Sequence, residues 1–169
     1  MKFQPKSGGA EAVKCELAAE CLRASELLRL GVRGWSMVPT IWPDDVLMIE
    51  KITPAGVSQG DLVLFGDEGR FFVHRVVNAN RFACAIQTRG DAMPRPDSPM
   101  DTDDLLGRVT FIVRGGRMLE PNANPGWASR AFAFLFQRSA VAARVIARAH
   151  SIYKNRRISS SDRAIPCQS

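Results

Sequence analysis

Between residues 46 and 114, five short apolar runs alternate with clusters of Gly, Asp, Asn and Pro. Each run has the length of a β-strand, and the clusters are rich in residues that form turns. The pattern predicts a mainly β fold, with hairpin turns at residues 67–70 and 78–80. The predicted strands are VLMIEKI from Val46, DLVLFG from Asp61, FFVHRVV from Phe71, FACAIQT from Phe82 and GRVTFIVR from Gly107.

A helix is predicted before this region, over residues 10–30, because apolar side chains recur there at spacings of three and four. Gly31 follows and is expected to end the helix. One face of the helix is expected to pack on the β domain. That predicted face holds Val13, Leu17, Cys21, Ala24 and Leu28.

A second helix is predicted after the linker EPNANPG, over residues 127–154. Arginines interrupt its apolar side chains, so we expect it to be basic and amphipathic. The polar residues after it are expected to be disordered. The predicted organisation is a helical segment over 1–31 packed on the body, a β domain over 32–120, the basic helix over 127–154 and a tail over 155–169.

Positive charge is concentrated at the C-terminal end of this 169-residue chain, whose formal net charge is +6. Residues 128–169 contain eight basic residues and one acidic residue, whereas residues 1–127 contain 15 basic and 16 acidic residues. Such a segment is typical of proteins that meet an anionic membrane, nucleic acid or an acidic partner, and also of plain solvated helices. Two interpretations stay open: the helix packs on the β domain, or it makes a peripheral contact with an anionic membrane. The arginines of that contact would be Arg130, Arg138, Arg144 and Arg148.

Several function classes are disfavoured. The four cysteines show no C-x-x-C spacing and only two histidines accompany them, so a Cys/His zinc site is not expected. No other metal or cofactor is implied. One predicted helix before Ser36 is too little for a helix-turn-helix, so no nucleic acid is expected as a partner. The chain starts without a charged-then-apolar export signal and has no apolar stretch near the ~20 residues that span a bilayer. The expected location is the cytoplasm, or the inner face of the membrane if the basic helix binds lipid.

Ser36 is a candidate nucleophile. It lies in the segment GWSMVPT, after a short extended run and before a turn that Pro39 stiffens. A hydroxyl in such a turn can point into a cleft while a backbone amide faces a developing oxyanion. A lone serine in a turn of this composition is also an ordinary turn residue.

His74 is the only histidine of the predicted β domain. Strand alternation places it on the same face as Phe72 and Val76, among apolar side chains. A neutral imidazole in this position can act as a general base. The simpler alternative is a half-buried histidine that a neighbouring group satisfies.

Two carboxylates, Asp91 and Asp97, lie six residues apart in the proline-containing segment TRGDAMPRPD. Either one could accept a hydrogen bond from a histidine ring nitrogen and so fix the tautomer of the ring. Solvated acids in a turn are the alternative.

Taken in order, these segments resemble the signal peptidase I and LexA-type serine peptidases. GWSMVPTIWPDD resembles the nucleophile segment of that superfamily, QGDLVLF its Gly-Asp strand, and LLGRVTFIV its closing strand. A histidine followed by Arg and aliphatic residues, as at His74, resembles the archaeal and endoplasmic-reticulum branch, and TRGDAMPRPD resembles the Lys-Gly-Asp loop of that branch. The resemblance covers about residues 32–114.

The resemblance implies a coiled, barrel-like β-sheet and a serine endopeptidase that cleaves a precursor, signal or leader peptide. It assigns Ser36 as the nucleophile, His74 as the general base and Asp97 as the third member that orients the base. Asp91 matches a structural turn and is the second choice for that third role. The backbone amide of Ser36 matches one oxyanion donor. Apolar residues that could line a substrate pocket, or belong in part to the core, are Trp35, Met37, Ile41 and Trp42.

Three features depart from the family pattern. Some relatives carry a serine with an oxyanion-donating hydroxyl two residues before the nucleophile, where this chain has Gly34. Asp44 occupies the place of the glycine in a Gly-Asp pair, while Asp45 keeps the acid. Signal peptidases are anchored by transmembrane helices, and no such segment is evident here. A competing hypothesis is therefore a catalytically inactive peptidase-like module that binds a peptide or membrane partner, whereas a LexA-like repressor fits less well.

Overall fold

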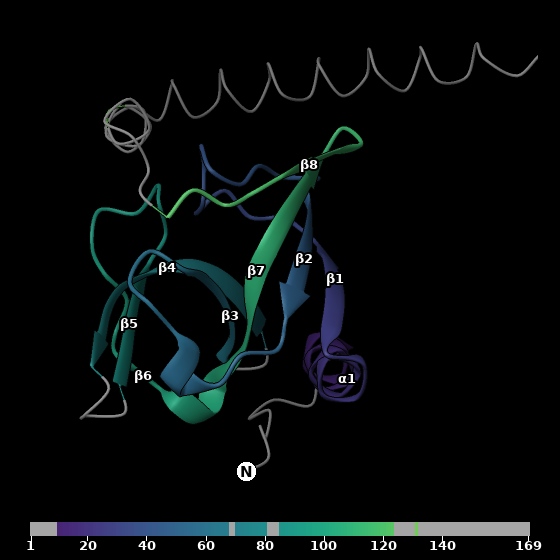
Figure 1. The fold of residues 1–169 in the computed structure, drawn as a ribbon, viewed down its shortest axis with the longest axis horizontal. Coiled ribbons are helices and arrows are strands. Elements are labelled where there is room, and N and C mark those ends of the chain that lie inside the picture. The colour runs from purple at the N-terminus through teal and green to yellow at the C-terminus, as the bar shows by residue number, and fades with distance from the viewer. Residues whose placement is uncertain (1–9, 68–69, 81–84, 124–130, 132–169) are drawn as a thin grey trace, which may run out of the picture.

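Within the residues that the structure describes, 10–67, 70–80, 85–123 and 131, eight strands pair into one antiparallel sheet. In this computed structural model the sheet curls into half a barrel (Figure 1). The strand order is β1-β2-β7-β3-β4-β5-β6, with β8 beside β7, so β1 and β6 lie at the edges. The elements are α1 (Ala10–Ser25), β1 (Leu27–Gly31), β2 (Val46–Glu50), η1 (Pro54–Gly56), β3 (Leu62–Asp67), β4 (Arg70–Asn80), β5 (Ala85–Arg89), β6 (Met100–Asp101), η2 (Thr102–Asp104), β7 (Leu105–Arg114) and β8 (Arg117–Leu119).

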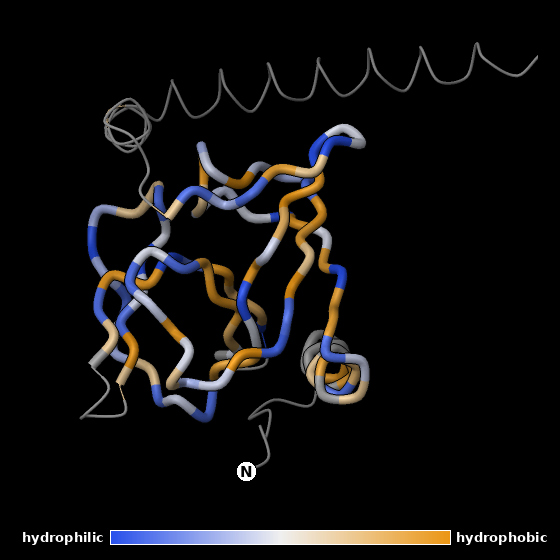
Figure 2. The backbone as a smooth tube through the Cα atoms, in the orientation of Figure 1, coloured by the Kyte–Doolittle hydropathy of each residue, from blue (hydrophilic) through white to orange (hydrophobic). Residues whose placement is uncertain are grey.

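The apolar run of β3 is buried on both faces because the strand serves two core clusters. Leu62 and Leu64 point into one cluster, which also holds Leu47 and Ile49 of β2. Val63 and Phe65, which alternate with them, point into a second cluster on the other face. A strand covered on both sides reads as a continuous apolar run, as LVLF does. Apolar residues accordingly follow the strands and hydrophilic residues recur at the connections (Figure 2).

The five predicted strands correspond to β2, β3, β4, β5 and β7, which confirms the mainly β prediction. The predicted hairpin at residues 67–70 is also confirmed, since Asp67 and Arg70 are cross-strand partners of β3 and β4. The predicted turn at 78–80 is wrong. These residues continue β4 and pair with residues 85–87 of β5, after a shift in register that follows Val76. A bulge lets Asn residues continue a strand that their turn preference argues against.

The N-terminal helix is shorter than predicted. It ends at Ser25, whose hydroxyl donates to the carbonyl of Cys21 over 2.6 Å, and Glu26 then takes a left-handed φ of 58°. The next residues form β1 and pair with β2. Leu28 and Leu30 alternate with exposed neighbours at the period of a strand. Leu28, which was predicted to lie on the packed face of the helix, therefore belongs to strand β1.

The buried face of α1 is also not the predicted one. Ala19 and Leu22 are buried, whereas Val13 and Leu17 are 58% and 61% exposed and Cys21 is exposed. Leu22 packs over Gly107 of β7, where a Cβ atom would lie only 3.0 Å from a Leu22 methyl group. This close approach selects the helix face that carries Leu22 for packing on the sheet.

The predicted basic helix at 127–154, with Arg130, Arg138, Arg144 and Arg148, and the predicted tail at 155–169 lie outside the described residues, apart from residue 131. In the part of the chain that is described, no helix combines the length and the apolar character needed to cross a membrane.

Candidate active site

The loop between β1 and β2 presents Ser36. Its two ends are joined by backbone hydrogen bonds, one from the Val32 amide to the Asp45 carbonyl and one from the Asp44 amide to the Val32 carbonyl, both 2.9 Å. The segment between them must therefore leave the sheet and return, and Ser36 lies within it. The loop geometry places the serine beside β4 rather than in a strand.

The buried Asp45 carboxylate holds the second half of this loop. It accepts a hydrogen bond from the Trp42 amide over 2.8 Å and a forked ion pair from Arg114 of β7, with separations of 2.6 and 2.9 Å. Arg114 also donates to the Thr40 carbonyl. A bidentate pair of this kind fixes the relative orientation of the two side chains and also stabilises their contact. Asp45 thus anchors the serine loop to the sheet.

Asp44 shows why a glycine would suit its position. Its φ is 71°, in the left-handed region that glycine adopts without steric cost and that Asp tolerates better than most residues. The departure from the Gly-Asp pattern therefore keeps the backbone shape.

His74 projects from β4 with 6% of its surface exposed. It is the cross-strand partner of Val63, and the rings of Phe65 and Phe72 lie 5.9 and 6.1 Å from its own. Its Nε2 atom lies 3.1 Å from the Ser36 hydroxyl oxygen. The structure therefore brings together two residues that are 38 positions apart in the chain.

Asp97 lies on the opposite side of the imidazole. One of its carboxylate oxygens, Oδ2, is 2.7 Å from His74 Nδ1. A carboxylate oxygen accepts hydrogen bonds, so Nδ1 carries the proton and Nε2 is left to accept from Ser36. The continuous chain Ser36–His74–Asp97 has the connectivity of a nucleophile, a base and an orienting acid.

Thr88, at 1% exposure, fixes Asp97 in turn. Its hydroxyl donates to the same Oδ2 atom over 2.7 Å, and its carbonyl accepts from the Asp97 amide over 2.8 Å. The Gln87 side chain donates to the Asp97 carbonyl. Both the amide and the carbonyl of Asp97 are therefore hydrogen-bonded to residues of β5, which holds the loop after β5 against that strand.

Asp91, the second choice for the third role, faces away from the histidine and pairs with Arg75. The Arg75 Nε and Nη2 atoms donate to the two Asp91 oxygens, each over 2.8 Å, and the Thr40 hydroxyl also donates to Asp91. Both charged side chains are more than nine-tenths buried. Asp91 therefore contacts Arg75 and Thr40 and not the histidine, which fits the structural-turn alternative for this residue.

Gly90 allows the two loops to meet. A Cβ atom on it would lie 2.6 Å from the Ser36 carbonyl oxygen and 3.2 Å from His74 Nε2. The Ala92 amide donates to the same Ser36 carbonyl over 2.8 Å. A side chain at position 90 would displace the serine backbone, so this position requires glycine for space.

The oxyanion side of the site is open. In the described part of the chain, the Ser36 amide donates to no other group. A Cβ atom at Gly34 would meet nothing within 4 Å. The predicted backbone donor is therefore available, and there is room for a side chain at position 34.

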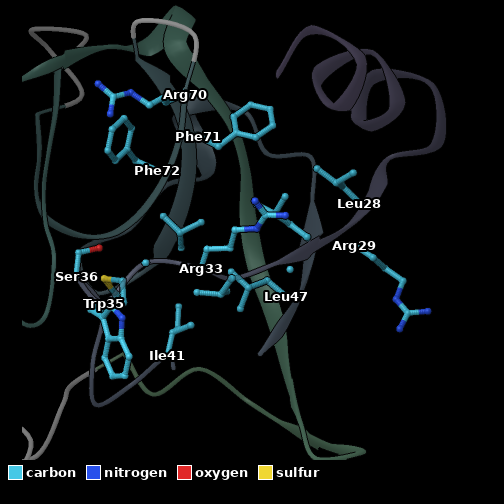
Figure 3. A pocket seen from close by; sticks show the side chains of 16 residues that line it. Leu28, Arg29, Arg33, Trp35, Ser36, Ile41, Leu47, Arg70, Phe71 and Phe72 are labelled. Carbon is cyan, nitrogen blue, oxygen red and sulfur yellow. The ribbon is translucent and has the colours of Figure 1, made fainter. Parts of the chain in front are cut away.

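A cavity of about 620 Å³ adjoins Ser36 (Figure 3). Residues 28–37 line it without interruption, and residues 70–73 at the start of β4 form another part of its wall. Of the predicted pocket residues, Trp35, Met37 and Ile41 line the cavity, and Met37 and Ile41 also belong to the core. Trp42 packs edge-on against Trp35 outside this lining, at a centroid distance of 6.3 Å.

The residues that sequence reasoning missed are those that hold the three central ones in place. Thr88 and Gly90 lie in the TRGD segment and Arg75 follows His74 directly, so a signal was present in the motifs. Their roles depend on contacts across the fold that spacing alone does not give. Among the described residues, no group of three or more His, Cys, Asp or Glu side chains is placed to hold a metal ion.

Comparisons of the chain with protein-family models, with curated proteins and with solved structures found no match.

Proposed function

We propose that the protein is a serine endopeptidase, related in fold to the signal peptidase and LexA-type enzymes. The observation that carries the proposal is the contact chain from Ser36 Oγ to His74 Nε2, 3.1 Å, and from His74 Nδ1 to Asp97 Oδ2, 2.7 Å. The curled antiparallel sheet and the order of the motifs along it support the relationship.

The first half of the reaction forms an acyl-enzyme. The Ser36 oxygen bonds to the scissile carbonyl carbon as its proton passes to His74 Nε2, and Asp97 stabilises the resulting imidazolium through Nδ1. The Ser36 amide donates to the oxyanion. The carbon–nitrogen bond then breaks, and His74 gives its proton to the leaving amine.

In the second half, His74 takes a proton from water as the water oxygen bonds to the acyl carbon. The Ser36 oxygen leaves and recovers its proton from His74. The products are a carboxylic acid and the free enzyme. Every proton transfer uses the same ring nitrogen, which is the one that faces Ser36.

The substrate peptide is expected to bind as an added strand. β1 is an edge strand that pairs with β2 on one side, and its residues and the serine loop line the cavity consecutively. Main-chain groups at such an edge bind an extended peptide, and pockets select its side chains. A strand laid along β1 would be directed to Ser36, which suits a precursor, signal or leader peptide.

The second candidate function is peptide binding without cleavage, and Gly34 is the observation that favours it. Loss of one oxyanion donor costs on the order of 10²–10³ in rate. The contact chain at Ser36 favours hydrolysis, because binding alone does not need an aligned hydroxyl, imidazole and carboxylate.

Labelling with a fluorophosphonate, with the modified residue located by mass spectrometry, tests the proposal. We expect labelling of Ser36 in the wild type, none in Ser36→Ala, and a strong reduction in His74→Ala. Ser58→Ala is the matched control, since Ser58 is exposed and its hydroxyl makes no hydrogen bond among the described residues. Labelling that persists in Ser36→Ala would remove the serine from its assigned role.

A further inference from the structure

The cavity beside Ser36 combines an apolar lining with positive charge. Three of its sixteen lining residues are arginines and none is acidic. Many of the other lining side chains are partly buried aliphatic and aromatic groups that rest on the core. These are Leu28, Leu30, Val32, Phe71 and Val73.

Arg33 is the arginine whose guanidinium lies inside the cavity (Figure 3). Figure 3 shows its guanidinium within the cavity, among the apolar side chains, whereas Arg29 points away from it. Arg33 is exposed, and it forms no ion pair or hydrogen bond with any described residue. Arg70 lies at another side of the same cavity, and it too forms no ion pair in the described part of the chain.

Three other arginines of the sheet are paired with carboxylates. Arg75, Arg108 and Arg114 each form an ion pair, with Asp91, Asp61 and Asp45 respectively. Positive charge that supports the fold is therefore balanced by a carboxylate. The unbalanced charge at the cavity is available to an anionic group that comes from outside.

We propose that Arg33 selects peptides that carry an Asp or Glu side chain beside an apolar segment. This specificity rests on the proposed peptidase function. Arg33 is three residues from Ser36, so their Cα atoms are at most about 10 Å apart along an extended chain. The acidic residue is therefore expected near the scissile bond, within reach of the arginine side chain.

The charge pattern disfavours the chain's own C-terminal segment as the occupant. Residues 128–169 contain eight basic residues and one acidic residue, so they would be repelled by the arginines. The concave shape and the strand edge of β1 favour an extended peptide over a bilayer surface.

The test measures binding rather than cleavage, using the full chain with Ser36→Ala. Three sets of fluorescent peptides share one apolar sequence and carry Glu, Gln or Lys at each position in turn. At one position or more, we expect the Glu peptide to bind about two- to fivefold more tightly than the Gln peptide, the range of an exposed ion pair. Arg33→Gln should abolish the difference, and Arg33→Glu should shift the preference to the Lys peptide.

Arg29→Gln is the matched control, because it removes the same charge from a side chain that points away from the cavity. Equal effects of Arg29→Gln and Arg33→Gln would overturn the proposal, as would equal binding or no binding of the Glu and Gln peptides. Vesicles of anionic lipid that bind through Arg33, in place of peptides, would also overturn it. Charge-selective binding without fluorophosphonate labelling of Ser36 would retain this inference and reject the peptidase function. Labelling of Ser36 without charge-selective binding would reject this inference and retain the peptidase function.

Discussion

Asp91 and Asp97 lie in the same loop, six residues apart, and serve different purposes. Asp97 is 31% exposed and contacts the imidazole of His74, with Thr88 as its other side-chain partner. Asp91 is 8% exposed and is enclosed by Arg75 and Thr40. One carboxylate therefore contacts the imidazole, and the other supports the loop on which the first depends.

The different surroundings predict different consequences of the same substitution. A carboxylate that pairs with a buried arginine contributes to stability, because its loss leaves an uncompensated charge in the interior. A carboxylate that orients a histidine contributes to rate, since its loss permits the wrong tautomer. Asp→Asn at the two positions preserves size and separates the two contributions.

The largest expected effect is that of Asp97→Asn on activity. An amide NH₂ would donate where the carboxylate accepted, so the proton of His74 would be misplaced. We expect kcat to fall about 10³- to 10⁴-fold, with a free energy of unfolding within about 1 kcal/mol of the wild type because the side chain is partly exposed. Peptide cleavage assays and urea denaturation measure the two quantities. A normal kcat would exclude Asp97 from the site.

Asp91→Asn is expected to affect stability most. Arg75 would keep its burial and lose its counter-charge, which typically costs about 3–5 kcal/mol. Urea denaturation should show this loss as a lower midpoint with an unchanged slope. Arg108→Gln is the control, since that arginine is 41% exposed, its pair with Asp61 spans 3.8 Å, and exposed pairs contribute ~1 kcal/mol or less. Equal losses in the two variants would contradict the structural role of Asp91.

The strands of the body could be predicted because their signals are local. β2, β3 and β7 are short apolar runs between turn residues, and no helix fits between those turns. β1 was missed because Leu28 and Leu30 fit both the end of a helix and a strand. Only pairing with β2 decides between them. The face of α1 that was predicted to be buried is exposed for a similar reason. The contact between Leu22 and Gly107, which buries the other face, depends on the folded sheet.

The motifs pointed to Ser36 and His74, which the structure brings into contact, but spacing alone could not decide whether Asp91 or Asp97 contacts the histidine. The path of the loop after β5 is set by long-range hydrogen bonds, from the Ala92 amide to Ser36 and from the Asp97 amide to Thr88. These bonds turn one acid toward His74 and the other toward Arg75. Such contacts exist only once the sheet has formed.

Gly90→Ala tests whether the loop that carries both acids must touch the serine loop. The new Cβ atom would meet the Ser36 carbonyl at 2.6 Å, so the serine must move. A displacement of about 1 Å can cost about 10²-fold in rate, so we expect kcat to fall by that order. Gly34→Ala is the matched control, because its Cβ atom meets nothing within 4 Å. Full activity of Gly90→Ala would show that the loops can separate without loss of function.

Gly34→Ser is expected to raise activity. The position has space for a side chain, and a hydroxyl there would add a donor on the oxyanion side. We expect kcat to rise by about tenfold or more, since one such donor is worth on the order of 10²–10³ in optimised sites. Gly34→Ala separates the effect of the hydroxyl from that of the Cβ atom. A rise in both variants would point to the backbone instead.

The smallest effect is expected for Thr88→Val, which removes one of the hydrogen bonds that hold Asp97 and keeps the shape of a fully buried side chain. Asp97 would retain its hydrogen bonds to His74 and to the Thr88 backbone. The variant therefore loses one hydrogen bond to a charged group, which contributes about 1.5–3 kcal/mol, and less where water replaces it. We expect kcat to fall about threefold to tenfold with KM unchanged, and Thr88→Ser to restore it. Thr110→Val is the control, because that hydroxyl donates to the Met48 carbonyl on a distant part of the sheet. If Thr88→Val lowered kcat as much as Asp97→Asn, the orientation of His74 would depend on the threonine as much as on the carboxylate. The contrast between Asp97 and Asp91 would then reflect Thr88, which holds only one of the two acids.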